Sequence, residues 1–318
     1  MVPMLFSRRM AVVAAAVSLL AVVAGCGEDT DGSSETTGGS KDPMQLSASF
    51  YPLAWMAEEV GGEHVEVSNL TPPGAEPHDL ELTPTDVAAV SDADLVVYLS
   101  GFQPAVDEAV TQADQASVFD AAEWADLSLT YTPIEEGEEE TDEAGAVDPH
   151  FWLDPARFAA VATAFAEQLS ERDPEHAADF EANLASLTDR LEDVDANFKT
   201  GLADCTSENL VTSHNAFGYL ADRYGMVQVG ITGLTPEEEP SPADLAAVTQ
   251  FVEENDVRTI YFETLVSPDI AKAIAAEAEV DTGMLDPLEG LNDESQGSDY
   301  LEVMASNLAN LRRGQDCS

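Results

Sequence analysis

The chain has 318 residues, of which 44% are hydrophobic, enough for one or two packed cores and in keeping with two domains of ordinary size. Its 62 Asp and Glu residues against 12 Lys and Arg give a formal net charge of −50. Such an acidic chain excludes nucleic-acid binding through neutralised phosphates and electrostatic binding to an anionic membrane, and it favours cations as partners. Adaptation to salty or acidic surroundings would explain the charge equally well.

The N-terminus has the pattern of an export signal. Arg8 and Arg9 precede an apolar run over 10–24, which is too short to span a bilayer as a mature helix. The run ends in Val23-Ala24-Gly25-Cys26, which resembles a bacterial lipobox, where cleavage falls before the cysteine and its thiol is lipidated. We therefore expect a lipoprotein signal peptide over 1–25 and acylation (palmitate) of Cys26. The alternative is a cleaved, unlipidated signal with a chance cysteine.

The segment after Cys26 predicts a tether. Residues 27–42 are Gly, Ser, Thr, Asp, Glu and one Lys, with no large apolar residue, so they cannot bury enough surface to offset chain entropy. We expect 26–45 to be a flexible tether. The mature protein would then be extracytoplasmic and lipid-anchored to the outer face of the cell membrane.

From residue 46 onward, short β-prone runs alternate with helical stretches. Strands are expected at Leu46–Phe50, His64–Leu70, Asp94–Ser100 and Ala116–Phe119. Helices are expected at Pro52–Val60, Thr85–Ser91 and Pro104–Ala113. This alternation predicts a parallel sheet covered by helices, and we place an N-terminal α/β lobe at 46–173.

The stretch 132–147 within this lobe is strongly acidic, with seven carboxylates between Glu135 and Glu143. Self-repulsion and the near-absence of large apolar residues predict a disordered surface loop. It either collects cations weakly or is a solvated insertion, and we favour the insertion because unstructured glutamates bind divalent ions poorly.

The second half of the chain repeats the first. A stretch rich in Ala, Leu and Glu begins at Pro155 and is broken only near Asp173-Pro174, which predicts a helix, a turn and a long linking helix over 174–201. Strands are then expected at Asn209–Ser213, Val227–Ile231, Arg258–Phe262 and Val280–Leu285. Helices are expected at Asn215–Tyr224, Pro242–Asn255, Pro268–Ala278 and Asp299–Leu311. The fold class is therefore α/β, with two Rossmann-like lobes at 46–173 and 202–318 joined by one long backbone helix.

Two cysteines remain if Cys26 carries lipid. Cys205 and Cys317 lie in a protein exported to an oxidising compartment, so we expect them to form one disulfide. Their spacing is unlike any close-set metal-binding motif.

The histidines carry the candidate chemistry, and there are only five: His64, His78, His150, His176 and His214. His64 and His176 are expected at the surface. The other three lie in loops next to predicted strand or helix ends, and Asp286 directly follows the strand ending at Leu285. Ligands of open α/β sheets bind at the carboxyl ends of strands. We therefore expect a metal site in the cleft between the lobes, with two ligands from each lobe.

Five segments resemble a known family: Pro73-Gly-Ala-Glu-Pro-His-Asp79, Asp148-Pro-His-Phe-Trp-Leu-Asp-Pro155, Ser213-His-Asn-Ala-Phe-Gly-Tyr-Leu-Ala-Asp-Arg-Tyr-Gly225, Glu239-Pro-Ser-Pro242 and Pro287-Leu-Glu-Gly290. They are similar to the zinc- and manganese-binding lipoproteins of bacterial ABC importers, the cluster A-I solute-binding proteins, and most closely to the ZnuA-like zinc-binding members. The resemblance covers the chain from about Leu46 to its end. It implies two lobes bridged by a rigid helix, metal in the cleft and delivery to a membrane permease.

The resemblance also implies a ligand set. The first three ligands of the family fall on His78, His150 and His214, and the acidic fourth falls on Asp286. Three imidazoles and a carboxylate suit tetrahedral zinc, whereas manganese prefers more oxygen ligands, so His214 is the discriminating residue. Glu263 either accepts a hydrogen bond from a ligating imidazole or lies at the surface. Zinc members often carry a His-rich loop ahead of the second ligand, and here that loop is acidic and has no histidine.

The expected function is therefore capture of a divalent transition metal, zinc rather than manganese, and its delivery to the permease of an ABC importer. We expect a monomer that is not an enzyme and does not bind nucleic acid. A zinc-dependent hydrolase would need an open coordination position and a nearby base, and His-Glu-x-x-His is absent. A surface adhesin would leave the four ligand positions unexplained.

Overall fold

The structure is a computed structural model that describes residues 42–134 and 144–318. The export signal, Cys26 and most of the expected tether lie outside the described residues, as does the glutamate-rich part of the acidic loop at 135–143. Residues Asp42–Ser318 form one compact unit. Within the described part of the chain, no helix is both long and apolar enough to cross a membrane.

The N-terminal lobe is built on a four-stranded parallel sheet with the order β2-β1-β3-β4. Its strands are β1 (Met44–Ala48), β2 (Val65–Asn69), β3 (Leu95–Tyr98) and β4 (Val118–Asp120). Its helices are α1 (Tyr51–Gly61), α2 (Pro84–Asp92) and α3 (Pro104–Val110). Leu95 and Val97 pack with α1, and Val96 packs with α2 and α3 on the other face. A strand covered on both faces must be apolar throughout, which explains the run at 95–97.

The C-terminal lobe repeats this arrangement with the order β6-β5-β7-β8. Its strands are β5 (Asn209–Thr212), β6 (Val227–Gly230), β7 (Thr259–Phe262) and β8 (Asp281–Met284). Its helices are α6 (Gly218–Tyr224), α7 (Pro242–Glu254), α8 (Asp269–Glu277) and α9 (Tyr300–Gly314). Short 3₁₀ turns occur at Gly62–His64, Gln115–Ser117, Ala121–Glu123 and Phe151–Leu153. Both parallel sheets and their alternating helices agree with the fold class expected from the sequence.

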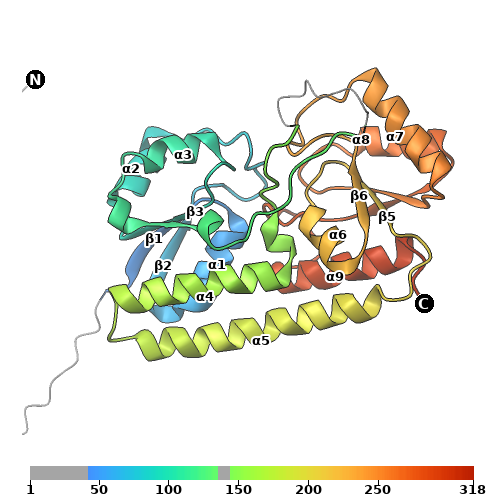
Figure 1. Cartoon of the computed structure of the whole chain (residues 1–318). Coiled ribbons are helices and arrows are strands. Elements are labelled where there is room, and N and C mark those ends of the chain that lie inside the picture. The colour runs from blue at the N-terminus through green and yellow to red at the C-terminus, as the bar shows by residue number, and fades with distance from the viewer. Residues whose placement is uncertain (1–41, 135–143) are drawn as a thin grey trace, which may run out of the picture. The chain divides into compact units, whose positions relative to one another are not determined.

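Two long helices connect the sheets. Helix α4 (Pro155–Arg172) begins where the Asp154 side chain accepts hydrogen bonds from the backbone N–H groups of Ala156 and Arg157. Helix α5 (Ala177–Gly201) packs against α4 and α1 at one end and α9 at the other, so it runs along both lobes (Figure 1).

Two helices begin later than the sequence predicts. Helix α5 begins at Ala177 rather than near Pro174, because His176 donates its backbone N–H to the Asp173 carbonyl (3.1 Å) and closes a turn first. Helix α6 begins at Gly218 rather than Asn215, because Asn215 donates its backbone N–H to the Gly233 carbonyl (2.8 Å). In both cases the residues just before the helix are held by backbone hydrogen bonds outside the α-helix.

The lobes share one buried core next to the cleft. Trp152 is fully buried and donates its indole N–H to the Pro287 carbonyl (2.8 Å). The Tyr300 hydroxyl donates to the Trp152 carbonyl (2.6 Å), and the Tyr300 ring stacks on Trp55 with centroids 4.8 Å apart. These contacts fasten the segment that carries His150 to the C-terminal lobe.

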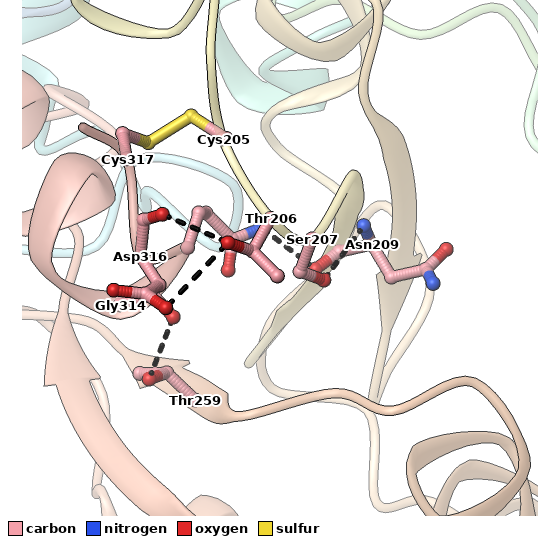
Figure 2. Close-up of a disulfide and its surroundings, with 9 residues drawn as sticks. Cys205, Thr206, Ser207, Asn209, Thr259, Gly314, Asp316 and Cys317 are labelled. Carbon is pink, nitrogen blue, oxygen red and sulfur yellow. Dashed lines mark hydrogen bonds between the residues drawn. A yellow bond between two sulfur atoms is a disulfide. The ribbon is translucent and has the colours of Figure 1, made fainter.

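The C-terminus is tied to the start of β5. Cys205 and Cys317 form the disulfide expected from the sequence, across a separation of 112 residues (Figure 2). Beside it the Thr206 hydroxyl donates to the Asp316 carbonyl (3.1 Å), and the Thr259 hydroxyl donates to the Gly314 carbonyl (3.2 Å). The end of α9 is therefore held to its own sheet by covalent and polar contacts together.

Candidate metal centre

Four buried side chains from both halves of the chain come together: His78, His150, His214 and Glu289. His78 lies in the loop after β2, and His214 follows β5 directly. His150 precedes the turn Phe151–Leu153, and Glu289 lies in the loop after β8. Parallel strands present the loops at their carboxyl ends to the cleft, so donors far apart in sequence meet there.

The distances among these donors fit one small metal ion. The Oε1 atom of Glu289 lies 3.2 Å from His150 Nε2, 3.2 Å from His214 Nε2 and 3.6 Å from His78 Nε2. Zinc bonds of roughly 2.0–2.2 Å in a tetrahedron place neighbouring donors about 3.3 Å apart. All four ligand atoms lie within 4.8 Å of one another. The three distances to Glu289 therefore fit the donor spacing of a tetrahedral zinc shell.

The site is deeply buried and carries unsatisfied polar atoms. His150 and His214 are 0% exposed, Glu289 is 1% exposed and His78 is 9% exposed. Among the described residues, the Nε2 atoms of His78 and His150 find no hydrogen-bond partner. Buried polar groups are nearly always satisfied, so these two imidazole nitrogens, which face the Glu289 carboxylate, fit a site that holds a cation.

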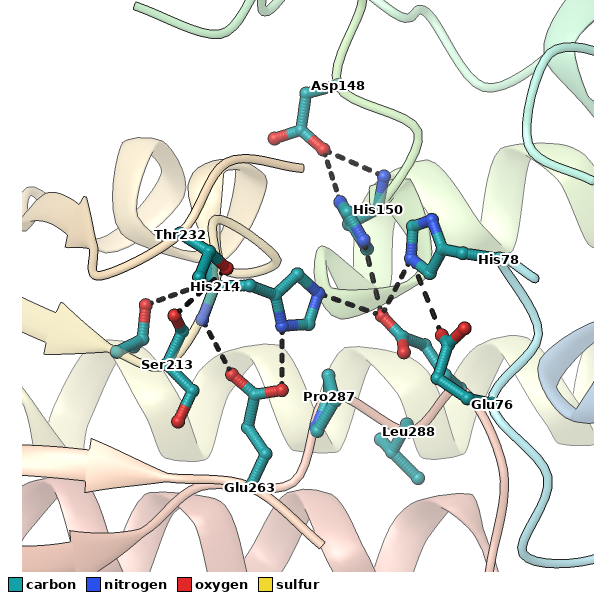
Figure 3. Close-up of polar contacts among 12 residues, drawn as sticks. Glu76, His78, Asp148, His150, Ser213, His214, Thr232, Glu263, Pro287 and Leu288 are labelled. Carbon is teal, nitrogen blue, oxygen red and sulfur yellow. Dashed lines mark hydrogen bonds and ion pairs between the residues drawn. The ribbon is translucent and has the colours of Figure 1, made fainter. Parts of the chain in front are cut away.

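Two of the imidazoles are oriented by carboxylates (Figure 3). His150 Nδ1 lies 2.8 Å from Asp148 Oδ1, and His214 Nδ1 lies 2.6 Å from Glu263 Oε2. The same two carboxylates accept the backbone N–H of the histidine that they hold, at 2.9 and 3.0 Å. A carboxylate that accepts from Nδ1–H leaves the Nε2 lone pair free for a metal.

The carboxylates and imidazoles of the site shift one another's pKa values. Burial lowers the pKa of His214, but Glu263 and Glu289 outweigh burial and hold it well above its ordinary value. Burial likewise lowers the pKa of His150, but the interactions of this imidazole with Asp148 and Glu289 outweigh burial and raise its pKa. Burial alone would raise the pKa of Glu289, yet the three histidines hold it well below its ordinary range. A metal must therefore displace protons from imidazole when it enters.

The structure brings a different acidic residue to the three histidines than the expected ligand set contains. Asp286 is buried, but Glu289, not Asp286, completes the group with the three histidines. Asp286 Oδ1 accepts the backbone N–H of Leu288 (2.8 Å), and Leu288 itself takes a left-handed conformation with φ 61°. Asp286 thus closes the turn that directs Glu289 into the cleft.

The remaining residues singled out in the sequence are placed as follows. Glu263 is 3% exposed and contacts His214 rather than solvent. His64 and His176 are partly buried and stack on each other, with ring centroids 3.9 Å apart, away from the cleft group. Cys26 lies outside the described residues.

Sequence reasoning missed three acidic residues. Glu289 and Asp148 stood inside the motifs Pro287-Leu-Glu-Gly290 and Asp148-Pro-His150, but nothing in the spacing assigned them a role. Glu76 lies two residues before His78, with Oε1 3.9 Å from His78 Nε2. Burial raises the pKa of Glu76 to about 9, and the neighbouring carboxylates of Glu289 and Glu237 raise it further.

The chain is similar to known zinc-uptake and zinc-binding proteins. Residues 47–314 match the family described as "ZnuA: Zinc-uptake complex component A periplasmic". The "High-affinity zinc uptake system protein ZnuA" of Bacillus subtilis is 35% identical over 299 residues, covering 92% of this chain and 93% of that protein. The "Zinc-binding lipoprotein AdcA" of Streptococcus pneumoniae is 35% identical over 280 residues, covering 86% of this chain but only 56% of that longer protein.

Solved structures show the same fold. The laminin-binding protein Lmb of Streptococcus agalactiae, described as a bifunctional protein with adhesin and metal-transporting activity, superimposes with a TM-score of 0.73. It shares 33% identity, and the match covers 86% of this chain and 99% of Lmb. The chain belongs to the ZnuA family of periplasmic zinc-uptake components.

Proposed function

We propose that this protein is the extracytoplasmic substrate-binding component of an ABC importer and that it captures one zinc ion for delivery to the membrane permease. The observation that carries the proposal is the convergence of His78, His150, His214 and Glu289 at tetrahedral spacing in a buried cleft. We propose these four residues as the zinc ligands, with the ion as cargo rather than as a permanent cofactor.

The donor set favours zinc over manganese. Three imidazole nitrogens and one carboxylate oxygen suit a borderline-soft tetrahedral ion, whereas manganese prefers more oxygen ligands and higher coordination. Glu76 Oε1 lies 3.9 Å from His78 Nε2 and is outside the group of four donors. The names of the relatives, zinc uptake and zinc binding, point the same way.

Binding rather than catalysis is the role that this arrangement serves. A catalytic zinc site keeps one coordination position open for water or substrate. Four protein donors filling a tetrahedron leave no such position, and the buried ion would be out of reach of a macromolecular substrate. We accordingly propose no enzymatic or adhesive activity for the cleft.

We further propose that the protein works as a monomer held at the outer face of the cell membrane by acyl chains on Cys26. The lipobox-like Val23-Ala24-Gly25-Cys26 and the polar segment after it support an anchor and a tether. The lipoprotein name of the pneumococcal relative is consistent with this location. Replacing Cys26 with Ala should release the protein from the membrane or leave it unprocessed.

Calorimetric titration of the metal-free protein with zinc tests the proposal. We expect one zinc per chain and a loss of at least a hundredfold in affinity for His78→Ala, which removes a cleft donor. His64→Ala is the matched control, because it removes an imidazole that stacks on His176 instead. Wild-type affinity in His78→Ala, or an equal loss in His64→Ala, would refute the assignment.

A further inference from the structure

We propose that Asp148 is the positioning residue for His150, and that it can hold this histidine only because Gly218 of α6 leaves space for its carboxylate. The contact between Asp148 and α6 of the C-terminal lobe would then set the orientation of the His150 imidazole. This inference rests on the proposed function, because it takes His150 to be a zinc ligand.

The Asp148 side chain binds both the backbone and the ring of His150. One carboxylate oxygen, Oδ1, accepts both the backbone N–H (2.9 Å) and the ring Nδ1–H (2.8 Å) of His150. Asp148 is only 4% exposed, so these bonds are shielded from water. The contact with Asp148 thereby fixes the ring orientation and tautomer of the imidazole (Figure 3). His150 Nε2 then lies 3.2 Å from Glu289 Oε1.

The other carboxylate oxygen of Asp148, Oδ2, occupies the space where a residue other than glycine at position 218 of α6 would have its Cβ atom. A Cβ atom built on Gly218 would lie 2.3 Å from Asp148 Oδ2, and real Cβ atoms do not approach so closely. The next neighbour, Leu129 Cδ1, would lie at an ordinary 3.6 Å. Gly218 has no positive φ angle, so its backbone does not itself require glycine. The carboxylate of Asp148 therefore accounts for the glycine at this position.

The backbone around Asp148 is also fastened to α6. The Tyr219 hydroxyl donates to the Asp148 carbonyl (3.0 Å) and accepts the backbone N–H of Leu129 (3.3 Å). Asp148 in turn donates its backbone N–H to the Leu129 carbonyl (2.9 Å). The Tyr219 hydroxyl thus binds the backbone of both paired segments, the one that contains Leu129 and the one that contains Asp148.

The two positioning carboxylates differ in what they depend on. Glu263 follows β7 and holds His214, which follows β5, so both partners belong to the same sheet. Asp148 instead can hold His150 only because Gly218 of α6 leaves space for the Asp148 carboxylate. Because α6 begins four residues after His214, a shift of α6 would disturb both histidines together.

A groove beside Asp148 allows the role of Gly218 to be tested by substitution, because it gives the displaced Asp148 carboxylate room. The groove has a volume of about 320 Å³ and is lined in part by Thr130, Asp148, Gly218 and Asp222. A carboxylate displaced by a methyl group on Gly218 can swing into this space. Gly218→Ala should therefore leave the fold intact. It should also break the hydrogen bond that orients His150, because Asp148 Oδ1 no longer reaches the imidazole once the carboxylate lies in the groove.

The experiment is a double-mutant cycle of Asp148→Ala and Gly218→Ala, read by zinc affinity and by the visible absorption of bound Co²⁺, which reports coordination geometry. Each single variant should lose 10- to 100-fold in zinc affinity, as is typical when a carboxylate that orients a ligating histidine is lost. The double variant should match Asp148→Ala within about threefold, because the clash disappears with the carboxylate. Asp148→Asn keeps the shape of the side chain, so Gly218→Ala should still lower affinity in that background.

Gly201→Ala is the matched control, since its added Cβ would crowd Leu308 at 3.0 Å on a helix remote from the cleft. It should keep the wild-type zinc affinity and Co²⁺ spectrum even if it lowers the unfolding temperature. Wild-type affinity and spectrum in Gly218→Ala, or losses that multiply in the double variant, would overturn the inference. A wild-type chain that binds no zinc would instead refute the proposed function itself.

Discussion

Glu289, rather than the expected Asp286, lies with the three histidines, and this leads to a paired prediction. Asp286→Asn should keep zinc binding within about tenfold and stabilise the metal-free protein at neutral pH. Glu289→Gln should weaken zinc binding by tenfold or more, about 1.4 kcal/mol per decade, because a neutral amide replaces the carboxylate in the group of four donors. The two positions lie three residues apart in one loop, so each variant serves as a control for the other.

The stability gain follows from the titration of Asp286. Burial raises the pKa of this carboxyl to about 6, above an ordinary value of 3.8. An acid with a raised folded pKa favours the folded state when protonated, so it costs stability as pH rises from about 4 to about 6. The cost then levels off at about 3 kcal/mol, from about 1.4 kcal/mol per pKa unit. Asparagine has no charge to bury and can still accept the Leu288 N–H.

The assay is denaturant unfolding of both proteins with a chelator present, at a series of pH values from 4 to 7. The difference in unfolding free energy should be below about 1 kcal/mol at pH 4 and grow to 2–3 kcal/mol at pH 7. Zinc affinity is measured by competition with a chelating indicator at pH 7. A larger loss of zinc affinity in Asp286→Asn than in Glu289→Gln would refute the assignment, and a difference that does not change with pH would refute the electrostatic reasoning.

Four further predictions concern the site and its surroundings. Zinc affinity should fall as pH drops, because the raised pKa values of His150 and His214 make protons compete above the ordinary imidazole range, and calorimetry in buffers of different ionisation enthalpy should detect one to two protons released per zinc. Replacing both cysteines of the Cys205–Cys317 disulfide with Ala should cost about 4–5 kcal/mol in urea unfolding, from a closed loop of 112 residues, and an unchanged midpoint would contradict the chain-entropy account. His214→Glu alone should weaken binding of every divalent metal, because the new carboxylate would face Glu263 and Glu289, whereas adding Glu263→Gln should shift preference from zinc toward manganese in competitive loading. Deleting residues 135–143 should leave zinc affinity within about tenfold, since all four proposed ligands lie elsewhere, and a larger loss in the same titration would make the loop part of the site.

The parts of the fold that follow from local pattern were predictable. Alternating β-prone and helical runs gave two parallel sheets, and histidines next to strand or helix ends gave the cleft, because parallel strands present their carboxyl-end loops on one edge. His78, His150 and His214 could be singled out because the chain has so few histidines and these three share that context.

The fourth donor was not predictable from the same rule. Asp286 and Glu289 are both acidic and both follow β8, and the choice between them depends on a turn. That turn combines a hydrogen bond from Leu288 N–H to Asp286 with a left-handed Leu288, a conformation that sequence patterns do not indicate for leucine. The positions of Asp148 and Glu263 depend likewise on contacts between distant segments, which spacing along the chain does not reveal.

X-ray absorption spectroscopy of the zinc-loaded protein tests the central claim most directly. The account predicts one zinc per chain with four light-atom neighbours at about 2.0–2.1 Å, including the outer-shell scattering of three imidazoles. In Glu289→Gln the three imidazoles should remain while the oxygen shell changes. A shell with fewer than three imidazoles, a sulfur neighbour, or six oxygen-rich neighbours in the wild-type protein would contradict the proposed site.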